Sequence, residues 1–438
     1  MRISPVDDAS TESSSPHLVK HASRPPPLAA ADLQLKTKPR RLRLLILLAL
    51  GLVAAVAASI LWSRRDSDPD RLFERARAEV ASGQSERAAE TVKRLASLRK
   101  PSPFDRLLRA QVAEARQRPE EALAELAFIN DNHPLAPIAR SLHGKIELKR
   151  ARLRSAESAF LQAIALSPDS LGLRRDLVYI YNLQHRQIEL DTLLHSLSER
   201  ETLDFQYLLH WGKTRNVVWN PNRDCEALAK CVEADPDDRR SRLALAEGFR
   251  RLNRLDDAAN TLAPLADSDP EARAQRVMLE LERNDPDKAQ QILQGADPED
   301  PALAYVRGRV AIARGDGPAA VRYFRSALKT APNDRAVLFS LGAALKFNGD
   351  PAAAEPYLNA AQRHDAITPL ITIASTAAGA NDPTIPARLA AACEAAGRLY
   401  ESRAWYKLAI SRDPLDQKSQ QGFFRLGQQI EKAADRPK

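Results

Sequence analysis

The apolar positions of this chain recur with a period of 34 residues between residue 69 and about residue 236, and a similar spacing continues beyond. When each unit is numbered from its first residue, position 24 is always large and apolar, and position 20 is usually small. Proline stands at position 32 in seven of ten units. Self-similarity at this period is typical of stacked helix pairs. The predicted units begin at residues 69, 103, 137, 171, 205, 239, 270, 301, 335 and 383.

Each recurring position has a physical reason. A small residue at position 8 lets the second helix of a unit approach the first closely. The large residue at position 24 fills the space between neighbouring units, where its burial contributes roughly 1.5–3 kcal/mol. The closing proline cannot continue a helix, so it separates one unit from the next. Since no unit can bury its apolar face alone, we expect the units to be stable only as a stack.

Two units carry the pattern most completely. The matching residues are Gly144, Ala156, Phe160, Ala163 and Pro168 in the third unit, and Gly308, Ala320, Phe324, Ala327 and Pro332 in the eighth. This pattern resembles the tetratricopeptide repeat (TPR) family over about four-fifths of the chain. The resemblance implies antiparallel helix pairs that form a right-handed superhelix, with a concave groove that holds partner proteins. It does not indicate which partner.

The predicted fold is therefore all-α, a right-handed superhelical solenoid of about ten TPR helix pairs over residues 69–416, behind one N-terminal transmembrane helix. An insertion at residues 369–382 separates the last two units, and it predicts an added short helix or a bend. Residues 417–438 predict a capping helix and tail, because the end of such an array needs a cover.

Residues 44–62 contain no charge, and as a helix they are long enough to cross a hydrocarbon core of roughly 30 Å. Five basic residues precede this segment and two follow it. The excess of positive charge stays in the cytoplasm, so the array is expected outside, in a bacterial periplasm. Residues 1–43 have too little apolar content to fold and predict a disordered basic cytoplasmic tail.

The alternative for this segment is a cleaved signal peptide, because Ala55-Val56-Ala57 fits a small-x-small cleavage site. A basic region that begins only after a long polar tail, and an apolar stretch longer than the usual 7–15 residues, favour an uncleaved anchor. The bilayer is then a partner through residues 44–62.

The net charge of +8 does not indicate nucleic-acid binding, because it is concentrated at one end. Residues 1–65 hold ten Lys and Arg against four Asp and Glu, a net of +6, which leaves +2 for the remainder. The basic segment is not accompanied by a recognisable RNA- or DNA-binding motif.

The three cysteines give no disulfide framework, and we expect Cys225, Cys231 and Cys393 to be buried thiols that act as small apolar residues. The histidines show no zinc-binding spacing, and the glycines form no phosphate loop. We therefore expect no cofactor, no metal and no catalysis.

The resemblance places side chains at positions 2, 5, 9, 12 and 13 along the concave groove. Nine of the 40 residues sampled there are basic and four are acidic. One hypothesis is a groove for an acidic or extended segment of another protein; the alternative is a set of solvated helix faces. The candidate groove residues are Lys145, Lys149, Arg175, Tyr179, Asn182, Lys213, Asn216, Arg250, Tyr305 and Arg309.

The fourth and fifth units depart most from the pattern. Trp219 stands in the turn of the fifth unit, where a glycine is expected. It is a candidate aromatic contact for a partner; alternatively, it packs over the imperfect joint between units.

Together these features predict a non-catalytic, membrane-anchored TPR scaffold for protein–protein interactions in the cell envelope. One alternative is an accessory subunit of an envelope export or maturation machine, for polysaccharide, lipoprotein or cytochrome assembly. Another is an enzyme or carbohydrate binder with a site in the fourth and fifth units.

Overall fold

The computed structural model describes residues 50–53, 68–216 and 220–434. The described residues form helices and turns, without a strand. The predicted tail 1–43 lies outside these residues, and so does the predicted anchor 44–62 except for residues 50–53. Among the residues that can be described, no helix has the length and apolar character needed to cross a membrane.

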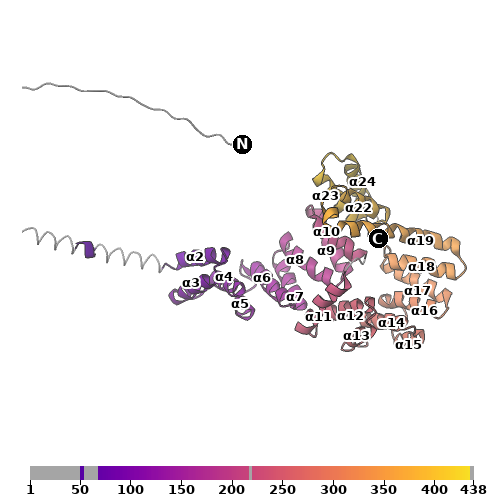
Figure 1. The fold of residues 1–438 in the computed structure, drawn as a ribbon, viewed down its shortest axis with the longest axis horizontal. Helices are drawn as coiled ribbons and strands as arrows, with labels where there is room; N and C mark the ends of the chain where they lie inside the picture. Colours follow the sequence, from indigo (N-terminus) through magenta and orange to yellow (C-terminus); the bar gives the residue numbers. More distant parts are fainter. Residues whose placement is uncertain (1–49, 54–67, 217–219, 435–438) are drawn as a thin grey trace, which may run out of the picture. The chain divides into compact units, whose positions relative to one another are not determined.

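From residue 69 onward, helices alternate along the chain as the first and second members of successive units (Figure 1). The first helices are α2 Pro69–Ala81, α4 Pro103–Ala115, α6 Ala136–Lys149, α8 Leu171–Leu183, α10 Phe205–Arg215, α12 Arg239–Arg251, α14 Pro270–Glu282, α16 Pro301–Ala313, α18 Arg335–Phe347 and α22 Ile385–Ala395. The second helices are α3 Ser85–Leu98, α5 Pro119–Leu126, α7 Leu153–Leu166, α9 Gln187–Arg200, α11 Pro221–Ala234, α13 Leu255–Leu262, α15 Pro286–Ile292, α17 Gly317–Thr330, α19 Pro351–Asp365 and α23 Leu399–Arg412. Three further helices are α20 Ile367–Ala374, α21 Ala377–Asn381 and α24 Gln417–Ala434. The prediction of an all-α solenoid of helix pairs is confirmed for this part of the chain.

Helix starts follow from the residues that precede them. The Asp269 side chain accepts hydrogen bonds from the backbone N–H groups of Glu271 and Ala272, and Pro270 occupies the first position of α14. Both features are favoured at a helix N-terminus, because the first N–H groups have no partner within the helix. Pro270 and Pro301 therefore do more than close a unit: each also opens the next helix.

Within a regular unit, position 8 and position 24 touch. A Cβ atom added to Gly144 would lie 2.5 Å from the Phe160 ring, and one added to Gly308 would lie 2.5 Å from the Phe324 ring. Both phenylalanines are completely buried. The small residue and the large one therefore form a single contact, which brings the two helices of the unit together.

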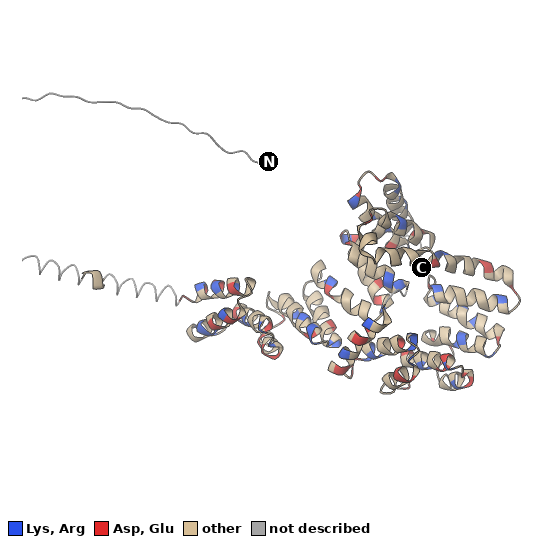
Figure 2. Ribbon diagram, viewed as in Figure 1, with Lys and Arg blue, Asp and Glu red and all other residues tan. Residues whose placement is uncertain are grey.

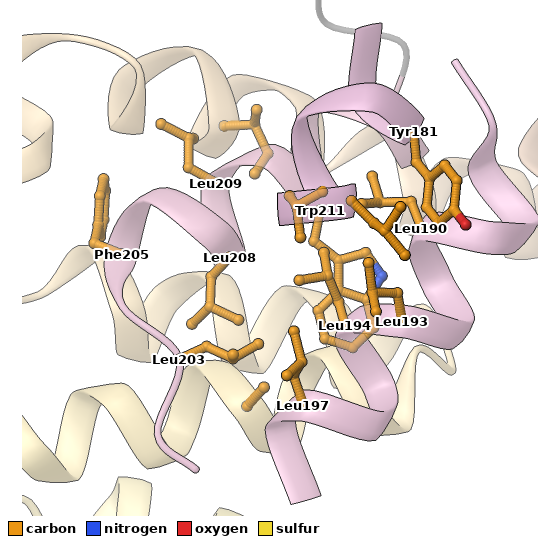
Figure 3. Close-up of a cluster of buried hydrophobic side chains, with 14 of the residues drawn as sticks. Tyr181, Leu190, Leu193, Leu194, Leu197, Leu203, Phe205, Leu208, Leu209 and Trp211 are labelled. Carbon is orange, nitrogen blue, oxygen red and sulfur yellow. The ribbon is translucent and has the colours of Figure 1, made fainter. Parts of the chain in front are cut away.

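The fifth unit does not follow this rule. Its first helix, α10, packs against α8, α9, α20 and α23, whereas α11 packs chiefly against α12. Trp211 of α10 lies among the leucines of α9, in the largest apolar cluster of the described residues (Figure 3). The fifth unit, whose sequence departs from the repeat pattern, is therefore not a packed helix pair, because α10 finds its neighbours elsewhere in the chain.

The C-terminal helices supply those neighbours. The Phe205 and Trp405 rings meet edge to face with centroids 5.7 Å apart, and Arg412 lies over the Phe205 ring at 4.9 Å. Helix α23 consequently packs against α9 and α10, and α22 and α24 pack against α23 (Figure 1). The insertion at residues 369–382 contributes to α20 and α21, and buried Ile371 belongs to the same apolar cluster as Trp211.

Candidate functional site

A hollow of about 860 Å³ lies on the inner side of the central units. Its lining residues come from the first helices α12, α14 and α16, from the turn before α9 and the start of α9, from Arg215 at the end of α10, and from the end of α17 with the turn that follows it. On these first helices, eight of the lining residues occupy positions that the sequence assigns to the groove, namely Arg240, Leu243, Glu247, Arg250, Glu271, Ala274, Met278 and Ala302. This is the volume of a ligand-sized site.

The lining of the hollow combines apolar and charged side chains. Leu243, Met278 and Val306 contribute apolar surface from three consecutive first helices. Ile188, at the start of α9, is 79% exposed although it is a large apolar residue. A bound chain that covers these apolar side chains gains binding free energy. The charged side chains beside them can orient its polar groups.

The charges in the hollow are paired with one another. Arg240 donates to Glu271 at 2.7 Å and lies 3.8 Å from Glu189 on the opposite wall. Arg250 pairs with Glu282 and also donates to Gln275 at 3.2 Å. Figure 2 shows the same mixture of basic and acidic residues along α12 and its neighbours. The hollow therefore presents no excess of one sign of charge.

One carboxylate in the hollow is strongly held in its charged form. Burial alone would raise the pKa of Glu247, but nearby His185 and the positive charge of Arg251, which donates to the Glu247 carboxylate at 2.7 Å, outweigh it and lower the pKa to about 2. Interactions within the protein therefore keep the Glu247 carboxylate ionised, whether or not a ligand is bound. A bound segment would meet Glu247 as an anion at neutral pH.

Three of the candidate groove residues, Lys145, Lys149 and Arg175, lie on α6 and α8, away from the hollow. Each is paired with an acidic residue that is not among the residues sampled for the groove. The partners are Asp176 at 3.7 Å, Glu114 and Glu201, respectively. In every pair the basic side chain is the more exposed one. Their charge is compensated, yet it is the cationic ends that reach the solvent.

Tyr179, Asn182 and Lys213 do come together, in a second hollow of about 340 Å³ between α8, α10 and α11. Asn182 accepts a hydrogen bond from Thr214 at 2.8 Å. Asp224 lies in the same hollow, and burial raises the pKa of its carboxyl group. The candidate contact Trp219 lies outside the described residues.

The remaining candidates are separated from these sites. Asn216 accepts from Arg398 at 3.2 Å, which places it in the contact between α10 and the C-terminal helices. Tyr305 packs against Phe324, and Arg309 donates to the Tyr305 hydroxyl at 3.4 Å. Of the ten candidate groove residues, only Arg250 lines the larger hollow.

The opposite wall of the hollow could not be predicted from the repeat pattern. Ile188, Glu189 and Asp191 belong to a second helix, and residues 331–334 form the turn after another second helix, α17. Groove positions are defined only on first helices, so neither segment was sampled.

All three cysteines are free and buried, as expected. Burial raises the pKa of the Cys231 thiol to about 11 and that of Cys393 well above its usual value. These thiols are therefore uncharged at neutral pH. The described part of the chain holds no group of three or more His, Cys, Asp or Glu residues that could bind a metal ion.

Comparison with known proteins supports the repeat architecture. A family model described as tetratricopeptide repeat matches residues 280–345, from the end of α14 to α18. A search of the curated proteins finds no match to this chain.

Two solved structures illustrate the likeness. The APC/C hetero-tetramer Cut9–Hcn1 is 15% identical, with 80% of this chain and 68% of that one covered, at a TM-score of 0.35. A tetratricopeptide repeat protein from Parabacteroides merdae is 14% identical, with 56% of this chain and 98% of that one covered, at a TM-score of 0.30. At such scores the likeness carries no information about function.

Proposed function

Because this chain carries tetratricopeptide repeats, which bind other proteins, we propose that it is a non-catalytic scaffold that holds a segment of a partner protein in the 860 Å³ hollow. The observation that supports this proposal is the lining. Groove positions of three consecutive first helices face one hollow, and exposed Ile188 lies on its other side. Many modest contacts along such a surface give affinity without a reactive group.

The paired charges favour a protein segment over a small charged ligand. A phosphate or carboxylate compound would need an excess of basic groups, whereas the Arg240–Glu271 and Arg250–Glu282 pairs leave none. Gln275, Asn333 and Thr330 instead offer amides and hydroxyls that can pair with the backbone of a bound chain.

The experiment is an affinity pull-down of the tagged full-length protein after cross-linking in cells, read by mass spectrometry. We expect Ile188→Glu to reduce recovery of the partner about tenfold, equivalent to about 1.4 kcal/mol, because a carboxylate replaces an exposed apolar contact. Leu415→Glu is the control, since Leu415 is equally apolar and 86% exposed but lies outside the hollow. Equal recovery with both variants would contradict the proposal.

We further propose that residues 44–62 anchor the protein in a membrane, with residues 1–43 cytoplasmic and the array on the outer side. The support is the uncharged length of the segment and its basic N-terminal flank. A reporter that fluoresces only in the cytoplasm, fused at the C-terminus of the full chain, should stay dark. Carbonate-washed membranes should retain the protein; fluorescence, or release by carbonate, would overturn the anchor.

The same pull-down addresses the envelope role. A reproducible set of envelope proteins would support a scaffold there. Recovery of the components of a single export or maturation machine would favour the accessory-subunit alternative.

A further inference from the structure

The C-terminal helices occupy the place that α11 would hold against α10. In the regular eighth unit, Gly308 packs on Phe324 of the same unit. In the fifth unit, a Cβ atom added to Gly212 would collide with the Ile371 side chain of α20. The chain therefore completes its fifth unit with a helix from its C-terminal part.

Polar contacts extend this interface. Arg398, which is buried, donates to Asn216 at 3.2 Å and to the Nδ1 atom of His364 at 3.1 Å. Lys407 donates to the carbonyl oxygens of Ser198 and Glu201 at 3.2 and 2.9 Å. Those carbonyls lie at the C-terminal end of α9, where a helix leaves acceptors unpaired and carries partial negative charge.

The centre of the interface is poorly satisfied. Glu401 is completely buried, and its Oε2 atom lies 3.6 Å from Nη1 of both Arg215 and Arg398. Neither carboxylate oxygen has a hydrogen-bond partner among the described residues. Buried charges with incomplete hydrogen bonding add little to stability, because desolvation offsets their attraction. At this centre, the cost of desolvating the charges therefore works against the apolar contacts that hold the C-terminal helices on α9 and α10.

The interface also forms part of the wall of the 860 Å³ hollow. Asp191 accepts hydrogen bonds from Trp211 at 2.6 Å and from Arg215 at 2.9 Å, and Asp191 and Arg215 both line the hollow. In addition, Asn333 of the lining turn lies 3.7 Å from the position that a Cβ atom would take on Gly397. Movement of the C-terminal helices would alter the hollow on two sides.

From these contacts we propose that the segment Ile367–Arg412 is a latch. It docks on α9 and α10 as a unit, and it can detach while the remaining helix pairs stay folded. Its release loosens two walls of the hollow and so regulates the entry of a partner segment. The regulatory step rests on the proposed function of the hollow; the latch itself does not.

The test compares two isoleucines of α20. Ile371 is completely buried against α10, whereas Ile373, on the same helix, is 42% exposed. We expect Ile371→Asp to increase the radius of gyration in small-angle X-ray scattering while circular dichroism shows nearly unchanged helix content. Ile373→Asp should match the wild type in both measurements. An unchanged radius for Ile371→Asp, or loss of helix throughout the array, would overturn the latch.

Hydrogen exchange of the wild-type protein gives a second test that needs no variant. If the latch opens as a unit and its helices lose their packing, backbone amides of α20, α22 and α23 exchange at a common rate, faster than those of α16–α18. Slower exchange, or exchange at unrelated rates, would contradict it. Neither measurement involves a partner, so failure of the latch and failure of the scaffold proposal are distinguishable.

Discussion

At the scale of single residues, the contact between Gly308 and Phe324 shows how two sequence positions set the spacing of a helix pair. The glycine has no side chain, so the phenylalanine ring lies directly against the backbone of the first helix. A ring in this place is surrounded on all sides, and Phe324 is completely buried. Its loss would leave a cavity that the two helices cannot close without moving.

The first prediction concerns this ring. Phe324→Ala should destabilise the array by about 3–5 kcal/mol, because it removes apolar burial and creates a cavity. Phe339→Ala is the control, since the Phe339 side chain is 47% exposed, and we expect an effect within about 0.5 kcal/mol. Urea unfolding followed by circular dichroism measures both. Similar losses for the two variants would contradict the assignment of Phe324 as an interior contact.

The second prediction concerns pH and His364. Burial, together with the positive charges of Arg398 and Arg215, lowers the pKa of His364 from 6.5 to about 4. Between pH 6.5 and 4 the unfolded chain therefore binds a proton that the folded chain does not, so stability falls as the pH is lowered through this range. The thermal midpoint should drop between pH 7 and pH 5.

In His364→Gln, whose amide oxygen can still accept from Arg398, that part of the pH dependence should be absent. The comparison isolates His364, because the other titrating groups are common to both proteins. An identical pH slope in the two proteins would show that His364 is not the group responsible.

At the scale of elements, the N-terminus of α12 links two parts of the chain. Asp238 caps α12 by accepting from the N–H groups of Arg240 and Ser241, and it is almost completely buried. It also accepts from the Ser241 hydroxyl at 2.6 Å and from the Gln184 amide, at the end of α8, at 3.3 Å. An ordinary cap serves one helix, whereas this one also connects the fourth unit to the sixth.

The third prediction compares two caps. Asp334→Ala removes an ordinary cap of α18 and should cost about 1 kcal/mol. Asp238→Ala should lower the free energy of unfolding by about 1–3 kcal/mol more than Asp334→Ala does, because the buried Gln184 amide also loses this acceptor. Denaturant unfolding of both variants measures the difference. Equal losses would mean that the link between α8 and α12 does not contribute to stability.

The elements show where sequence reasoning succeeds and where it stops. First helices begin at Pro69, Pro103 and Pro301, where the repeat pattern places unit starts, because capping and proline act locally. The pairing of α10 with α20 rests on a contact between Gly212 and Ile371, which no local pattern reveals. The same limit applies to the hollow: Arg250 was found from its position on a first helix, whereas Ile188 was not.

At the scale of the whole array, the first unit packs chiefly against the unit that follows it. Helices α2 and α3 pack against each other and against α4. Stability in such an array is close to a sum of units and of contacts between neighbours. The C-terminal helices differ, since they contact both α19 and the distant α9 and α10.

The fourth prediction follows from this difference. Deletion of residues 69–102 should leave the remaining helices folded, with helix content per residue unchanged by circular dichroism, because only the contacts to α4 are lost. The remaining chain should still unfold at nearly the same temperature. A general loss of helix would show that the first unit supports distant units as well.

The contact between Gly212 and Ile371 has a consequence for how this protein can change during evolution. An open array gains or loses whole repeats with little penalty, because each addition only lengthens it. Here the chain leaves α10, passes through the pairs from α12 to α19, and returns to α10. The intervening helix pairs must therefore span the fixed distance between α10 and the C-terminal helices that pack on it. Duplication or loss of a repeat is therefore tolerated before α8 but is selected against between α12 and α19.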